Sequence, residues 1–150
     1  MSRASFATAA LLVLGARAGV AQSAAGAVTF FDSTRVAAAF AKGVPLVETS
    51  AYKIHASRRE TAGKGEVHVK DTDIIYVLQG QATFVTGGSM IDPQTVAPDE
   101  IRGARIEGGD TRTLKPGDVI IVPNGTPHWF KEVQAPFLYY TVKVTQAGGM

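Results

Sequence analysis

The chain has 150 residues, of which 45% are hydrophobic, so it can bury one packed domain, and wholesale disorder is excluded. It contains no cysteine, which excludes disulfide bonds, thiolate metal ligands and a thiol nucleophile. Removing Arg3 and Arg17, which lie in the first 21 residues, from the 15 basic residues leaves 13, equal to the 13 acidic residues, so we expect no nucleic-acid partner.

Residues 1–21 have the pattern of a secretory signal peptide. A positively charged start precedes a small, apolar stretch, and Gly19 and Ala21 are typical of the residues before a cleavage site. The alternative is a membrane anchor, but Arg17 limits the apolar run to about 13 residues, well short of the roughly 20 that span a bilayer. We therefore predict cleavage before Gln22, no stable membrane anchor after cleavage, and a periplasmic or secreted location.

Residues 22–45 are predicted to form a lead-in and one short helix. Asp32 or Ser33 can cap the start of the helix by accepting a hydrogen bond from a free backbone amide. Gly43 followed by Pro45 is a typical helix end. The apolar residues expected on its buried face are Val36, Ala37, Phe40 and Ala41.

From residue 46 onward, apolar residues recur with a period of two, which predicts strands. The expected strands are 46–57, 65–70, 73–79, 81–86, 111–114, 118–123, 127–133 and 136–145. Gly80 and the Asn124-Gly125 pair predict tight turns, and residues 87–110 predict a long loop, either functional or disordered. Many short strands without intervening helices predict an all-β domain over 46–146, folded as a closed barrel or as a sandwich.

Four side chains that can bind metal are expected to converge in this domain. Glu66 and His68 point to the same face of one strand, because residues two apart in a strand do so. Asp73 can join them if its strand pairs with theirs as a hairpin, and His128 follows a predicted turn. Two nitrogen and two oxygen donors suit a divalent Mn, Fe, Ni or Zn ion. The alternative is a metal-free polar cluster, in which Lys or Arg from 87–110 balances the two carboxylates.

Two stretches also have characteristic spacing. The first reads Glu66-x-His68, four residues, Asp73, six residues, Gly80; the second reads Gly117, five residues, Pro123-Asn124-Gly125, two residues, His128, three residues, Glu132. These stretches resemble the two motifs of the cupin superfamily of small jelly-roll barrels. The resemblance implies that the all-β domain is an antiparallel double-sheet β-barrel. The second departs from the family only at its last position, and the first keeps only its second histidine and its closing glycine. By position, the resemblance implies metal ligands at Glu66, His68, Asp73 and His128.

The resemblance implies a wide range of reactions, including those of isomerases, dioxygenases, lyases and decarboxylases. We predict an exported protein with a divalent-metal pocket that acts on a small polar molecule, with the reaction type unresolved. The alternative is a non-catalytic binding or sensing protein with a degenerate metal site. A third hypothesis is a structural protein whose barrel mainly supports dimerisation. We also expect a homodimer, since cupin barrels often pair through an outer sheet face.

Further candidates for the pocket are weaker. Glu132 shares the face of His128 by simple alternation, so it is either a general base or a glutamate at the rim. Arg102 and Arg105 can clamp an anionic ligand or can be solvated arginines of the long loop. His55, which alternates with Lys53 and Ser57, is more typical of a structural histidine than of a pocket residue.

Overall fold

The computed structural model of the chain describes residues 27–146. The predicted signal peptide, residues 1–21, lies outside the described residues, so its cleavage and the export that it implies stay predictions. Within 27–146, no helix has the length and apolar character needed to cross a membrane.

The predicted helix is confirmed as α1 (Ser33–Lys42). Its N-cap is Asp32, whose carboxylate accepts a hydrogen bond of 2.7 Å from the backbone N–H of Arg35. Gly43 ends the helix in the left-handed conformation. The buried face differs in part from the expectation, because Ala39 and Phe40 are its buried residues.

The rest of the described chain is mostly strand. The strands are β1 (Pro45–Glu48), β2 (Tyr52–Arg59), β3 (Gly65–His68), β4 (Asp71–Thr86), β5 (Ser89–Ile91), β6 (Gln94–Ala97), β7 (Glu100–Gly103), β8 (Arg105–Glu107), β9 (Asp110–Leu114), β10 (Val119–Val122) and β11 (His128–Thr145). All their pairings are antiparallel, in one nine-stranded sheet and a small sheet of β5 and β8.

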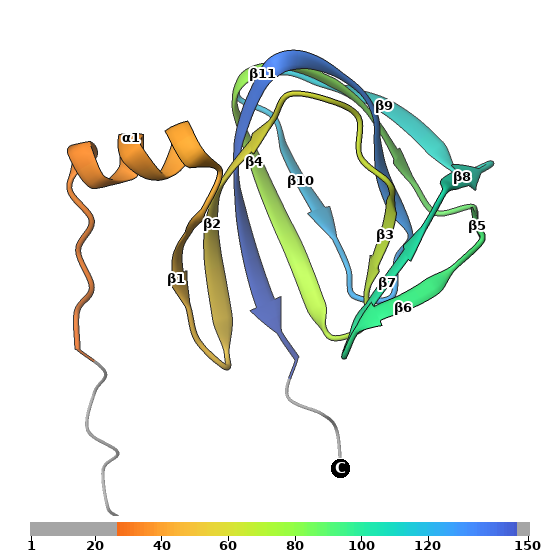
Figure 1. The fold of residues 1–150 in the computed structure, drawn as a ribbon, viewed down its shortest axis with the longest axis horizontal. Helices are drawn as coiled ribbons and strands as arrows, with labels where there is room; N and C mark the ends of the chain where they lie inside the picture. Colours follow the sequence, from red (N-terminus) through yellow and green to blue (C-terminus); the bar gives the residue numbers. More distant parts are fainter. Residues whose placement is uncertain (1–26, 147–150) are drawn as a thin grey trace, which may run out of the picture.

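The two longest strands, β4 and β11, connect the layers of the fold. They pair with each other along most of their length. The first half of β4 also pairs with β10 and its second half with β9, while β11 pairs with β3 at its start and with β2 further on. Figure 1 shows β11 arching over the top of the molecule, between β1 and β2 on one side and β3, β7 and β6 on the other. The all-β, antiparallel, double-sheet prediction is therefore confirmed.

Apolar side chains fill two clusters. The main core lies between the layers and contains Phe84, Phe130, Phe137 and Ile75 among its buried members. The second cluster forms where α1 packs against the sheet, with the Phe40 and Tyr140 rings in an edge-to-face contact at 4.9 Å. The helix therefore packs against β2 and β11 in a cluster separate from the main core.

Several predicted strand boundaries are wrong. The expected strand 46–57 is two strands, β1 and β2, which form a hairpin. Gly80 is not a turn, because β4 runs through it. It has a φ of +79°, and β4 bends there where the pairing with β11 changes register. The Asn124-Gly125 turn is confirmed, with Gly125 at a φ of +77°.

The segment 87–110 is also corrected, since it contains the four short strands β5 to β8 rather than an unstructured loop. Its strand β7 pairs with β3, so that Arg102 lies directly opposite Glu66. The expected hairpin between the strands of His68 and Asp73 does not form: β3 pairs with β7 and β11, and β4 pairs with β9, β10 and β11.

Candidate metal centre

Three of the four predicted ligands form one group. Glu66 and His68 project together from β3, and His128, the first residue of β11, is the direct cross-strand partner of Glu66. One potential ligand atom from each of the three lies within 4.8 Å of the other two. The turn before β11 holds this arrangement, because the backbone N–H of Gly125 donates a hydrogen bond of 2.8 Å to the carbonyl of His68.

His128 is buried and its ring is held in one orientation. Its Nδ1 lies 3.0 Å from the carbonyl oxygen of Thr126, an acceptor, so Nδ1 carries the proton and Nε2 has the free lone pair. Burial is the largest influence on this imidazole and lowers its pKa below the ordinary value of 6.5, although the Thr126 carbonyl acts in the opposite direction. His128 is therefore neutral at neutral pH, which is the form that binds metal.

Asp73 reaches the group from β4 but has a different partner. Its carboxylate lies 3.4 Å from His68 Nε2 and accepts hydrogen bonds from Lys143 Nζ through both oxygens, at 2.8 and 2.9 Å. Burial raises the pKa of Asp73, but His68 and Lys143 together outweigh burial and hold it below its ordinary value of 3.8. The carboxylate is thus ionised and paired with Lys143, and Asp73 lies beside the group formed by Glu66, His68 and His128. Its role as a metal ligand stays a prediction.

Two arginines flank Glu66 on the other side. A terminal guanidinium nitrogen of Arg59, from the end of β2, and one of Arg102, from β7, each lie 3.8 Å from Glu66 Oε1. Arg59 is a site residue that the sequence analysis missed. The signal was present, because Arg59 continues the alternation of Lys53, His55 and Ser57 along β2.

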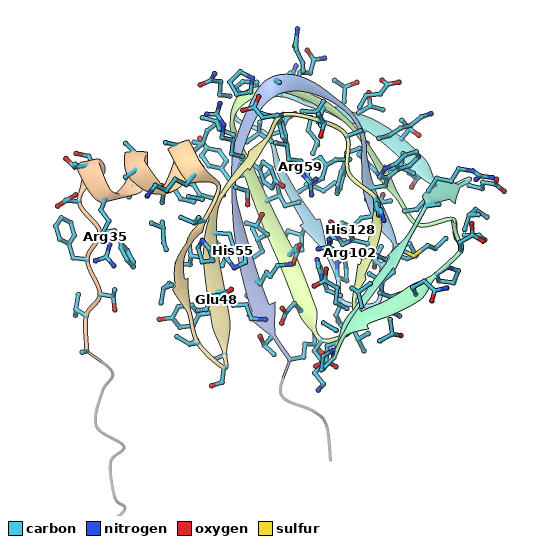
Figure 2. All side chains as sticks on the ribbon, in the orientation of Figure 1. Arg35, Glu48, His55, Arg59, Arg102 and His128 are labelled. Atoms are coloured by element: carbon cyan, nitrogen blue, oxygen red, sulfur yellow. The ribbon has the colours of Figure 1, made fainter. Side chains whose placement is uncertain are left out.

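These side chains line one cavity of about 440 Å³. Figure 2 labels Arg59, Arg102 and His128 among them. Charged and titratable residues on its wall include His55, Arg59, Glu66, His68, Asp73, Arg102, His128 and Lys143. His55 therefore lies at the pocket, where its Nε2 is 2.8 Å from Glu48 Oε1.

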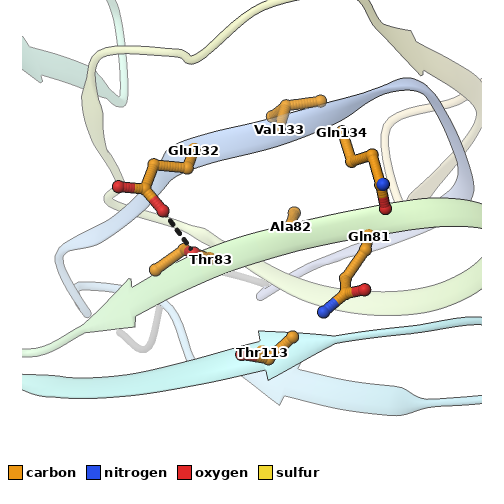
Figure 3. A pocket seen from close by; sticks show the side chains of 7 residues that line it. All are labelled: Gln81, Ala82, Thr83, Thr113, Glu132, Val133 and Gln134. Carbon is orange, nitrogen blue, oxygen red and sulfur yellow. Dashed lines mark hydrogen bonds between the residues drawn. The ribbon is translucent and has the colours of Figure 1, made fainter.

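Two of the expected pocket residues lie elsewhere. Glu132 does not share the face of His128, because β11 has a bulge between Phe130 and Glu132 that reverses the alternation. Its carboxylate accepts a hydrogen bond of 2.9 Å from Thr83 Oγ1 and lines a separate hollow (Figure 3). Arg105 is half-exposed, pairs with Glu107 and does not line the cavity.

The donor set fits a divalent ion. Two imidazoles and one carboxylate are the protein ligands of many catalytic zinc sites and of non-haem iron sites. Ligands that share one ion through bonds of about 2.0–2.2 Å lie no more than about 4.4 Å apart. The three potential ligand atoms, which all lie within 4.8 Å of one another, are therefore close to the separation that such an ion needs. Glu66, His68 and His128 could therefore hold the metal, and their chemistry does not identify which metal.

Comparisons with known proteins agree with this fold. The family model described as Cupin matches residues 20–150. A solved structure from Bacillus halodurans is 12% identical, with a TM-score of 0.58 over 83% of this chain and 86% of that one. A conserved protein of unknown function from Streptococcus pyogenes is 17% identical, with a TM-score of 0.50 over 69% of this chain and 73% of that one.

A double-stranded β-helix protein from Klebsiella pneumoniae is 18% identical, with a TM-score of 0.49 over 71% of this chain and 78% of that one. The likenesses to the Bacillus halodurans and Streptococcus pyogenes structures, at 12% and 17% identity, show the fold alone. The comparison with curated proteins gives no match.

Proposed function

Because this chain belongs to the cupin family, we propose that it binds a divalent metal ion through Glu66, His68 and His128 and acts on a small polar molecule in the adjoining cavity. The main support is the convergence of these three side chains from β3 and β11 on one point of the cavity wall. A bound divalent ion would supply a Lewis acid that polarises an oxygen atom of the substrate.

The residues around the metal-binding group have the other roles that such a site needs. Lys143 lies on the cavity wall with its ammonium group fixed by Asp73, so it can donate a hydrogen bond to a substrate oxygen. His55 lies on the same wall and can exchange a proton with substrate, while Glu48 orients its ring. Isomerase, dioxygenase and lyase chemistry all remain compatible with this set.

The alternative is a non-catalytic cupin that binds or senses a small molecule. The ion pair of Asp73 with Lys143 favours it, because the pair satisfies a buried carboxylate without a metal. Under this alternative, the cavity would bind the same class of molecule but would not convert it.

Elemental analysis of purified protein tests the metal proposal. Wild type, His68→Ala, His128→Ala and His55→Ala are each exposed to Mn, Fe, Ni or Zn and then desalted. The chain has three histidines, so His55→Ala is a matched control that removes an imidazole outside the ligand group. We expect one ion per chain in wild type and in His55→Ala, and little in the other two variants. Equal metal content in all four proteins would overturn the proposal.

Two further expectations from the sequence stay proposals. We propose a periplasmic or secreted location because of the pattern in residues 1–21. We propose a homodimer because of the family resemblance. Fractionation of cells that express the full chain, and the mass of the purified protein in solution, would test them.

A further inference from the structure

We propose that Arg59 and Arg102 form a two-guanidinium clamp that binds an oxyanion of the substrate beside the metal-binding group. This inference deepens the proposed function and rests on it for the identity of the site. It names the substrate class: a small molecule that carries a carboxylate or a phosphate.

Arg59 is held rigidly, as a recognition residue must be. Its Nε donates a hydrogen bond of 2.8 Å to the hydroxyl of Tyr139, and its guanidinium lies 4.4 Å from the centre of the Phe130 ring. Gly63 leaves room for this guanidinium, because a Cβ at Gly63 would lie 2.7 Å from one of its terminal nitrogens. The charged end of Arg59 is thus fixed in place at the cavity with little freedom left to lose on binding.

Arg102 approaches the same point from the opposite strand. Its cross-strand partner is Glu66, and its guanidinium also bonds to Glu100, two residues earlier on β7. The distance of 3.8 Å from each arginine to Glu66 Oε1 is longer than a hydrogen bond. Both guanidinium groups therefore lie near the carboxylate of Glu66 without donating a hydrogen bond to it. Each keeps N–H groups that can donate hydrogen bonds to a further anion.

The charge of the cavity also favours an anion. Apart from Arg58, which pairs with Glu60, the permanent cations on its wall are Arg59, Arg102 and Lys143, and its carboxylates are Glu66, Asp73 and Glu100. These charges balance, so a divalent ion would leave the cavity with two positive charges. An anionic ligand would neutralise part of this excess.

The shape of the clamp indicates how the ligand binds. A guanidinium offers two parallel N–H groups that match the two oxygens of a carboxylate or a phosphate. The cavity of about 440 Å³ limits the ligand to a small molecule. One end of the molecule would meet the clamp, and an oxygen further along it would face Glu66, His68 and His128.

Isothermal titration calorimetry at constant ionic strength tests the clamp. The probes are succinate, inorganic phosphate and uncharged succinamide, added to metal-loaded and to chelator-treated protein. The variants are Arg59→Lys and Arg102→Gln. Arg59→Lys keeps the positive charge but loses the planar guanidinium with its two parallel N–H groups. Arg105→Gln is the matched control, because Arg105 is also paired with a glutamate two residues away but does not line the cavity.

We expect succinate or phosphate to bind wild type and succinamide not to bind. Affinity should fall by about tenfold or more in Arg102→Gln and Arg59→Lys, the size of one lost charge-assisted hydrogen bond, with metal content unchanged. It should stay the same in Arg105→Gln. The tighter of the two anions identifies which group the ligand carries.

Trp129 provides a second readout at the clamp. It is the single tryptophan of the chain, and its Nε1 donates a hydrogen bond to the carbonyl of Gly63, beside Arg59. Anion binding at the clamp should therefore change its fluorescence.

The clamp and the metal proposal can fail separately. If wild type binds metal but neither anion, or if all three arginine variants bind the anions equally well, the clamp is wrong and the metal proposal stands. If no metal binds but the anions still bind in a way that depends on Arg59 and Arg102, the clamp stands and the metal proposal is wrong.

Discussion

Lys143 Nζ bridges both carboxylate oxygens of Asp73, at 2.8 and 2.9 Å, across the paired strands β4 and β11. The two side chains are 13% and 5% exposed, so this ion pair is nearly removed from water. Without Lys143, the nearest remaining partner of the buried Asp73 carboxylate among the described residues would be the imidazole of His68, 3.4 Å away. Lys143 therefore stabilises the ionised carboxylate of Asp73 beside the metal-binding residues.

We predict that Lys143→Met destabilises the protein by about 3–5 kcal/mol, because it leaves a buried charge without its main partner. Urea unfolding measures the change. The double variant Asp73→Asn, Lys143→Met should recover part of the loss, since it removes both charges. A loss below about 1 kcal/mol in the single variant, as for an exposed pair, would contradict the prediction.

We predict that acid weakens the metal-free protein through His128. Its pKa is lowered by burial in the folded state, so below the ordinary value of 6.5 the unfolded chain takes up a proton that the folded protein does not. The stability that His128 contributes is present above this pH and is lost as the pH falls. The unfolding free energy, measured in urea from about pH 7.5 to about pH 5.5, should fall less steeply in His128→Gln. Equal slopes would refute this role.

We predict that two glutamate substitutions differ sharply in their effect on metal binding. Glu66→Gln should reduce metal affinity about 10- to 100-fold or more, because it removes the carboxylate from the ligand group. Glu132→Gln should leave metal affinity unchanged, because Glu132 bonds to Thr83 in a separate hollow. Competition with a metal-binding dye measures both. A loss of metal in Glu132→Gln would mean that this side chain reaches the site.

We predict that Gly80→Ala costs more stability than Gly117→Ala. Both glycines have a positive φ, so both substitutions carry a backbone penalty of about 1–2 kcal/mol. A Cβ at Gly80 would also lie 2.6 Å from the carbonyl oxygen of Pro136, whereas at Gly117 it would meet no atom within 4 Å. The difference in unfolding free energy between the two variants, measured by thermal or urea unfolding, gives the cost of this close contact. Equal losses would show that the clash relaxes at little cost.

The fold could be predicted because its signals are local. The period-two alternation continues along β2, β4 and β11, and Asp32 and Asn124-Gly125 act within a few residues of their own position. The short strands of 87–110 lack that signal. All four residues of Gln94–Ala97 are exposed, so no apolar alternation distinguishes this strand from a loop.

The site could be predicted only in part, because strand pairing decides which side chains meet. The alternation predicted correctly that Glu66 and His68 share a face, but one bulge before Glu132 moved that residue out of the site. In the metal-free alternative, Lys or Arg from 87–110 balances both carboxylates. Arg102 of that segment does lie 3.8 Å from Glu66, whereas Asp73 is paired with Lys143 of β11. Arg59 joins the site through the pairing of β2 with β11, which no single stretch of sequence encodes.

Strand β11 contributes more to the cavity than any other single strand described here. It supplies a metal-binding side chain, the ring beneath Arg59, the hydroxyl that orients Arg59 and the counter-ion of Asp73, which are His128, Phe130, Tyr139 and Lys143. In contrast, Arg59, Glu66 and Arg102 come one each from β2, β3 and β7. Evolution or protein engineering can therefore retune ligand preference by exchanging Arg59 on β2 or Arg102 on β7, one at a time, while β3 keeps its metal-binding residues. A change within β11 would disturb several functions of the pocket at once.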